Sequence, residues 1–138
     1  MSHIIRQLSL CVVILAVVAS AFAYTNDQAS NGKELYVTYC AVCHGASGGG
    51  VKVPDQFGNF AGLTAPPLVG PGFLPGMETV GQVYDFASKN MPADKPGSLK
   101  SGEYLEIISF ALQANGINPD GEPLTPASAE KIKLPGGK

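Results

Sequence analysis

Hydrophobic and polar positions divide the chain into an apolar leader, a few helical stretches and a long irregular middle. In the leader, residues 8–23 form an apolar run behind Arg6 and end in Ala-Phe-Ala. A basic residue, an apolar stretch and an A-x-A ending are together typical of a secretory signal peptide. We therefore predict that residues 1–23 are removed on export and that the mature protein has no stable membrane insertion.

A membrane anchor and a lipoprotein are the alternatives to a cleaved signal peptide. The apolar run has sixteen residues, fewer than the roughly 20 that a membrane-spanning helix needs. Lipid attachment at Cys11 is disfavoured because the apolar run follows this cysteine and the bulky Leu10 precedes it. We interpret Cys11 as one more apolar residue of the leader.

Beyond the leader, the spacing of apolar residues predicts a small all-α domain. Gly32, Leu35 and Tyr36, for example, share one helix face, and Thr79 with Gln82 forms a capping box. The predicted helices span residues 29–39, 79–90 and 101–115, the last with Ser101 as N-cap and Gly116 at its end, and a short helix is expected from Thr125 to Lys131.

Removal of the leader reduces the chemical inventory sharply. The remaining 115 residues are enough for one domain. Because His3 and Cys11 are removed, one histidine and two cysteines remain. Nine basic residues less Arg6 stand against eleven acidic ones, for a net charge of about −3. Nucleic acid is therefore not an expected partner, since its phosphates need cationic side chains.

The remaining cysteines and histidine, Cys40, Cys43 and His44, form a C-x-x-C-H motif. A structural zinc site needs four ligands, and this motif offers three. A thioredoxin-like dithiol would follow a strand of a βαβ unit, and nothing strand-like precedes Tyr39. A disulfide within the motif would close only a short loop and restrain the unfolded chain little.

The same motif is the signature of covalent haem attachment. In such sites two thioether bonds hold the porphyrin, and the adjacent histidine binds the iron. We therefore predict one haem c that is covalently attached to Cys40 and Cys43, with His44 as an axial ligand of the iron.

A large cofactor also accounts for the irregular middle of the chain. Residues 45–78 contain nine glycines and five prolines, and a structureless loop of this length normally argues against a compact fold. The segment is too apolar for a disordered linker. We expect it to bury its large apolar side chains against the haem, namely Phe57, Phe60, Leu63, Leu68, Val69, Phe73 and Leu74.

With this motif the chain resembles the class I c-type cytochromes. The similarity rests on "NGKELYVTYCAVCHG", "APPLVGPGF", "KNMPADKPGSL" and "EYLEIISFALQANG", and is greatest to monohaem modules associated with periplasmic quinoprotein dehydrogenases. It implies a small cytochrome c fold in residues 24–116, with three main helices and long loops around the haem. Residues 117–138 form an extension that either wraps back or stays loose. The first and last main helices are expected to cross at Gly32, opposite Tyr104 or Ile108.

The resemblance also implies a partner for the histidine. A ligating histidine usually donates its other ring N–H to an oxygen, and in the family this oxygen is the carbonyl of a proline in a P-x-L element. Pro66 matches that position, with Pro67 as the second choice.

The sixth iron ligand is expected to be Met91. The family uses a Met-Pro element, and Pro92 biases the preceding residue away from helical geometry, so that the Met91 side chain can leave the helix line. Met77 fits ordinary packing, while Lys89 and an open sixth position are the alternatives. No second histidine remains after removal of the leader.

Ligation by histidine and methionine indicates electron transfer. A thioether raises the haem potential, and a filled sixth position leaves no place for oxygen to bind. We predict a periplasmic one-electron carrier, not an enzyme, between a dehydrogenase, such as a quinoprotein, and a terminal oxidase or another cytochrome. A haem enzyme or gas-binding sensor with a displaceable sixth ligand is the alternative.

Overall fold

The computed structural model describes residues 23–135, so the predicted signal peptide lies outside the described residues apart from Ala23. The elements are α1 (Asn26–Tyr39), α2 (Ala41–His44), the 3-10 helix η1 (Asp55–Phe60), α3 (Val80–Asn90), α4 (Ser101–Ala114) and α5 (Pro126–Ala129). Strand-like pairing in residues 23–135 is limited to isolated bridges. The predicted all-α class is therefore confirmed. None of the described helices is long and apolar enough to cross a bilayer.

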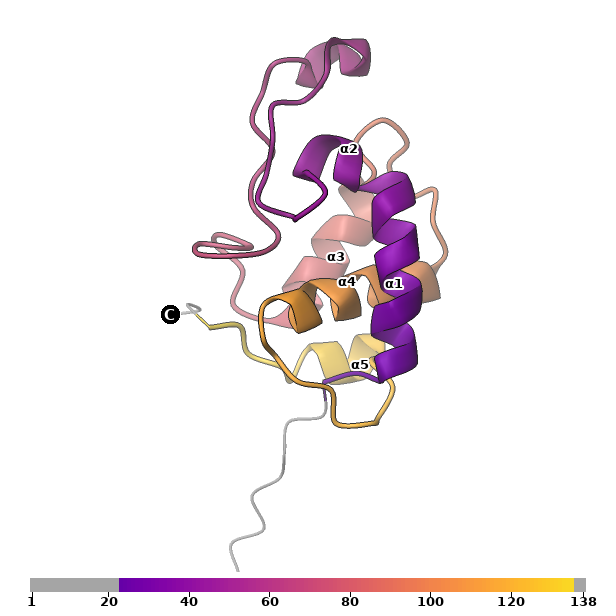
Figure 1. Cartoon of the computed structure of the whole chain (residues 1–138). Helices are drawn as coiled ribbons and strands as arrows, with labels where there is room; N and C mark the ends of the chain where they lie inside the picture. The colour runs from indigo at the N-terminus through magenta and orange to yellow at the C-terminus, as the bar shows by residue number, and fades with distance from the viewer. Residues whose placement is uncertain (1–22, 136–138) are drawn as a thin grey trace, which may run out of the picture.

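Helices α1 and α4 cross at a point where their backbones touch (Figure 1). A Cβ atom on Gly32 would lie 1.8 Å from the carbonyl oxygen of Glu106, so only glycine permits this approach. The prediction that Tyr104 or Ile108 lies opposite Gly32 was wrong. The backbone of Glu106, and not a side chain, faces the glycine. One turn further along α1, Tyr36 packs on Phe110 of α4 with ring centroids 5.0 Å apart.

Replacing Gly32 by alanine is expected to lower the free energy of unfolding by at least about 3 kcal/mol, the upper part of the usual cost of overpacking. The neighbouring carbonyl belongs to a helix backbone and has no torsion that moves it aside. Gly102→Ala is the matched control, because a Cβ there meets no described atom within 4 Å and alanine favours a helix by up to about 1 kcal/mol. Chemical denaturation of both holoproteins measures the difference. Equal stabilities would contradict the close contact.

Two helix starts differ from the sequence predictions. Helix α1 begins three residues earlier than expected, because Thr25 caps it and exchanges hydrogen bonds with Gln28. The N-cap of α4 is Lys100 and not Ser101. The Ser101 hydroxyl instead pairs with the hydroxyl of Tyr84 at 2.8 Å, which joins α4 to α3.

Residues 117–135 wrap back onto the helical core. The buried apolar side chains of this extension are Leu124, Ala129, Ile132 and Leu134. The amide of Val80 at the start of α3 donates to Ile132 at 3.0 Å, and the Gln28 side chain of α1 bonds both backbone groups of Leu124. Within the extension, the helix α5 ends before the expected Lys131. The extension therefore shares one core with the helices.

The irregular middle of the chain forms a long loop with η1 at its far end (Figure 1). Its base is fixed, because the carbonyl of Gly48 accepts from the amides of Leu68 and Val69 at 2.7 and 3.0 Å. Gly50 has a φ of 80°, and a Cβ there would lie 2.3 Å from the carbonyl oxygen of Ala65. The glycines of this turn thus allow two backbone segments to touch beside the C-x-x-C-H motif.

Candidate haem site

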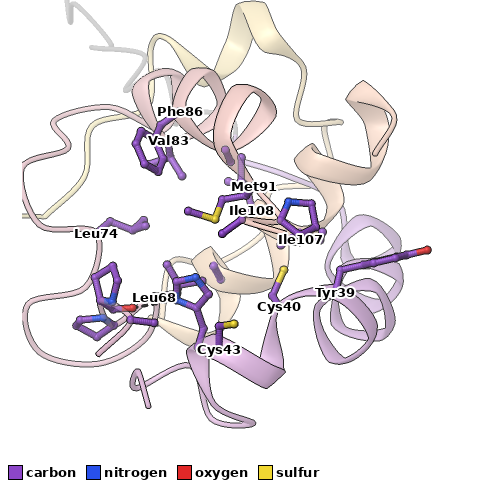
Figure 2. A pocket seen from close by; sticks show the side chains of 18 of the residues that line it. Tyr39, Cys40, Cys43, Leu68, Leu74, Val83, Phe86, Met91, Ile107 and Ile108 are labelled. Atoms are coloured by element: carbon purple, nitrogen blue, oxygen red, sulfur yellow. Dashed lines mark hydrogen bonds between the residues drawn. The ribbon is translucent and has the colours of Figure 1, made fainter. Parts of the chain in front are cut away.

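An apolar cavity of about 480 Å³ lies between the irregular loop and the helices α3 and α4 (Figure 2). Apolar side chains from α3, α4 and the extension form much of its wall, including Val83, Phe86, Ile107, Ile108, Leu112 and Leu134. The loop supplies Phe57, Phe60, Leu63, Leu68 and Leu74. Two other residues that were expected there, Val69 and Phe73, are not among the lining residues. Phe73 packs against the hydrophobic core instead, and Val69 covers Gly48.

The C-x-x-C-H motif forms one tight turn at an edge of this cavity. Cys40 ends α1 and begins α2, which closes with His44. The amides of Cys43 and His44 both donate to the carbonyl of Cys40, at 3.1 and 2.9 Å. This turn places all three motif side chains in the cavity lining, and both cysteines are free thiols.

The two thiols have the electrostatics of structural and not of redox-active cysteines. Burial, and after it the neighbouring Cys43, raises the pKa of Cys40 to about 11. Burial, and after it the carboxylate of Asp94, raises the pKa of Cys43. Thiol–disulfide enzymes rely on a cysteine whose pKa is lowered. The raised pKa values of both thiols therefore disfavour a dithiol redox centre.

The His44 side chain is oriented by a backbone carbonyl. Its Nδ1 lies 3.0 Å from the oxygen of Pro66, and because a carbonyl only accepts, Nδ1 carries the proton. Burial lowers the pKa of His44, although the bond to Pro66 acts in the opposite direction. A neutral ring protonated at Nδ1 leaves the lone pair of Nε2 free to bind a metal. The carbonyl of Pro67, the second choice, accepts from the amide of Leu74.

Two side chains whose contacts sequence reasoning missed, one in α1 and one at the C-cap of α4, hold these segments in place. The Tyr36 hydroxyl donates to the carbonyl of Gly45 at 2.6 Å, directly after the motif, and burial raises the pKa of Tyr36 to about 12. Asn115 donates to the carbonyl of Leu68 and accepts from the amide of Gly70, both at 2.9 Å. The signal for Tyr36 was its helical spacing, whereas nothing in the sequence pointed to Asn115.

Both methionines of the described chain line the cavity. Met91 follows α3 with extended backbone angles, φ −117° and ψ 153°, and its side chain points into the cavity that Cys40 and Cys43 also line (Figure 2). Met77 also packs against the hydrophobic core. Lys89 is not a lining residue, and its amine lies 3.9 Å from Asp85 on an exposed surface.

A small all-α fold whose C-x-x-C-H turn borders a large apolar cavity defines a c-type cytochrome. Residues 27–110 match the family described as "Cytochrome C oxidase, cbb3-type, subunit III". Because this match covers more than half of the chain, the protein belongs to that family of cytochrome c domains. It is therefore a haem-binding electron carrier, and the resemblance to class I c-type cytochromes is confirmed.

One relative and one solved structure with the same fold are dehydrogenases by name. The chain is 30% identical over 108 residues to the thiosulfate dehydrogenase of Stutzerimonas stutzeri (strain A1501), a match that covers 76% of this chain and 33% of that protein. It thus spans about a third of that relative. The fold also matches the sulfane dehydrogenase SoxCD from Paracoccus pantotrophus with a TM-score of 0.56 and 24% identity, over 79% of this chain and 54% of that chain. The second match shows the shared fold alone.

The residues of the site fit a haem c in three respects. The apolar walls suit a porphyrin, because burial of apolar surface on both sides is favourable. An imidazole with a free Nε2 and a thioether are ligands that haem iron accepts. Cys40 and Cys43 are both free thiols and line the same cavity, as covalent attachment through both requires.

Proposed function

We propose that the protein is an exported one-electron carrier with a single haem c, attached through Cys40 and Cys43, with His44 and Met91 as the axial ligands. Bound there, the haem iron supplies the one-electron couple between its ferric and ferrous forms. The observation that carries this proposal is the Nδ1 hydrogen bond of His44 to Pro66 at 3.0 Å, on the wall of a cavity that Met91 also lines.

The chain's own residues serve this function by keeping the site rigid and dry. Pro66 fixes the histidine ring, so that its geometry changes little between the two charge states. The apolar lining excludes water from the centre of the cavity, and a low-dielectric environment disfavours the extra charge of the ferric form. Together with a thioether ligand, this environment raises the midpoint potential of the haem. A high potential suits a carrier near the oxidising end of an electron-transport chain.

The proposed electron donor is a periplasmic dehydrogenase, and the acceptor is a terminal oxidase or another cytochrome. A quinoprotein dehydrogenase is the donor that the family resemblance implies. The name of the relative, a thiosulfate dehydrogenase, favours a dehydrogenase of a sulfur compound instead. Either donor must deliver single electrons to a haem.

A competing function is catalysis by the protein itself, which the name of the thiosulfate dehydrogenase favours. The chain covers 33% of that protein, and with His44 and Met91 as axial ligands the iron has no open position for a substrate. We expect added thiosulfate to leave the ferric protein oxidised in the absence of a partner. Reduction of the haem by thiosulfate alone would favour the enzyme.

The wild-type spectrum tests the proposal directly. The purified protein is expected to show one haem c per chain and, when ferric, the far-red charge-transfer band of sulfur bound to iron. Because both axial positions are filled, carbon monoxide should change the ferrous spectrum little within minutes. A rapid and complete carbon monoxide shift would favour a gas-binding sensor or a haem enzyme.

A further inference from the structure

Tyr104 links the two ends of the loop that carries Met91. This tyrosine lies in the first turn of α4 and is 4% exposed. Its hydroxyl donates to the carbonyl of Met91 at 2.6 Å and lies 3.4 Å from the amide of Leu99, which donates to it. Residues 91–99 form all but the last residue of the connection from α3 to α4, so a single hydroxyl joins the start of this loop to its end.

The backbone of Met91 is held on both sides. Its amide donates to Ala87 in the last turn of α3 at 2.9 Å. Its carbonyl accepts from the amide of Gly97 at 3.2 Å and from Tyr104 at 2.6 Å. A carbonyl oxygen has two lone pairs, and both are used here. The backbone of Met91 is therefore fixed to α3 at one end and to α4 at the other.

We propose that Tyr104 is a positioning residue that keeps the thioether of Met91 on the iron against competing ligands. This inference rests on the proposed ligation by Met91. A thioether is a neutral and weak ligand, and it stays bound only while its backbone holds the sulfur within reach. Displacement requires the loop of residues 91–99 to move, and this movement breaks the hydrogen bond to Tyr104. The hydroxyl thus stabilises the six-coordinate form selectively, as preorganised contacts do.

Packing alone does not explain the hydroxyl. The ring of Tyr104 lines the cavity with Ile107 and Ile108 of the same helix, and a phenylalanine would fill that space equally well. The hydroxyl, by contrast, meets two backbone groups and no other described polar side chain. Its specific effect therefore falls on the loop that carries Met91.

Tyr104→Phe in the full-length holoprotein tests this role, since it removes the hydroxyl and keeps the ring. Imidazole is titrated into the ferric protein while the far-red sulfur-to-iron band and the Soret band are followed. We expect the affinity for imidazole to rise about fivefold to tenfold. This ratio corresponds to the loss of one ordinary hydrogen bond from the form in which Met91 is bound to the iron. The wild-type protein should need correspondingly more imidazole to lose the same band.

Tyr84→Phe is the matched control. Its hydroxyl pairs with Ser101 at 2.8 Å and joins α3 to α4, but Tyr84 is not a lining residue of the cavity. Denaturation of each variant shows whether the two changes lower stability equally. A rise in imidazole affinity for Tyr104→Phe that Tyr84→Phe lacks supports the proposal, whatever their stabilities.

The outcomes separate this inference from the proposed function. If the ferric wild type shows the sulfur-to-iron band and loses it in Met91→Ala, the ligation holds. If Tyr104→Phe and Tyr84→Phe then both bind imidazole with the affinity of the wild type, the role of Tyr104 is overturned while the ligation by Met91 stands. A wild type without the band, or a Met91→Ala variant that retains it, would overturn both the ligation and the role of Tyr104.

Discussion

Replacing Cys40 and Cys43 together by alanine is expected to abolish covalent haem attachment and to leave an unstable protein. The physical reason is that the haem fills much of the interior, because the cavity of about 480 Å³ reaches residues of α3, α4 and the C-terminal extension. A native protein is stable by only about 5–15 kcal/mol, so the loss of such a partner is enough to unfold it. Acid–acetone extraction and the yield of folded protein measure the two effects.

Single variants supply the control for this experiment. Cys40→Ala and Cys43→Ala should each keep one thioether bond, so that haem stays with the protein fraction but its absorption bands shift. The double variant alone should release any haem into the organic phase. Haem that leaves the wild-type protein under the same conditions would contradict covalent attachment, and with it the haem c assignment at this motif.

The part of the site that could be predicted from sequence is the part that is local along the chain. The C-x-x-C-H spacing brings Cys40, Cys43 and His44 into one helical turn wherever that turn lies. Likewise, Pro92 predicted the extended backbone of Met91, because its ring restricts the residue directly before it. Such effects act between neighbours and need no tertiary structure.

The contacts that stabilise the site join residues far apart in sequence, and apolar spacing does not reveal them. The family resemblance placed Tyr104 near the crossing of the first and last main helices, but it did not reveal the target of the Tyr104 hydroxyl. The role of Asn115 depends on a loop more than forty positions earlier, at Leu68. Periodicity predicts which face of a helix is buried, whereas a hydrogen bond requires the position of a particular atom.

The differences at the edges of the fold have the same origin. Ser101 is a better N-cap than Lys100 by propensity, yet its hydroxyl bonds to Tyr84, and the cap moves back by one residue. The sequence did not predict whether the C-terminal extension wraps back or stays loose, because its apolar residues are few and widely spaced. Its burial follows from the core that α1, α3 and α4 present, which exists only once they have packed.

Replacing Met91 by alanine is expected to lower the midpoint potential and to open the iron to carbon monoxide. Axial ligands set haem potentials over about 0.8 V, and loss of a thioether, which favours the ferrous state, should lower the potential on the order of 0.1 V or more. The ferric band of sulfur bound to iron should vanish as well. Redox titration and a carbon monoxide difference spectrum of the ferrous protein measure these changes.

Met77→Ala is the matched control, since Met77 lines the same cavity and the two substitutions remove the same atoms. Its side chain is partly buried against the hydrophobic core, so its loss should cost less than the roughly 2–5 kcal/mol that is typical of a fully buried methionine. The potential and the carbon monoxide spectrum should change little, because the backbone of Met91 stays held by Ala87 and Tyr104. If Met77→Ala instead loses the sulfur-to-iron band while Met91→Ala keeps it, the sixth ligand is Met77. The hydrogen bonds to the backbone of Met91 would then serve only the fold.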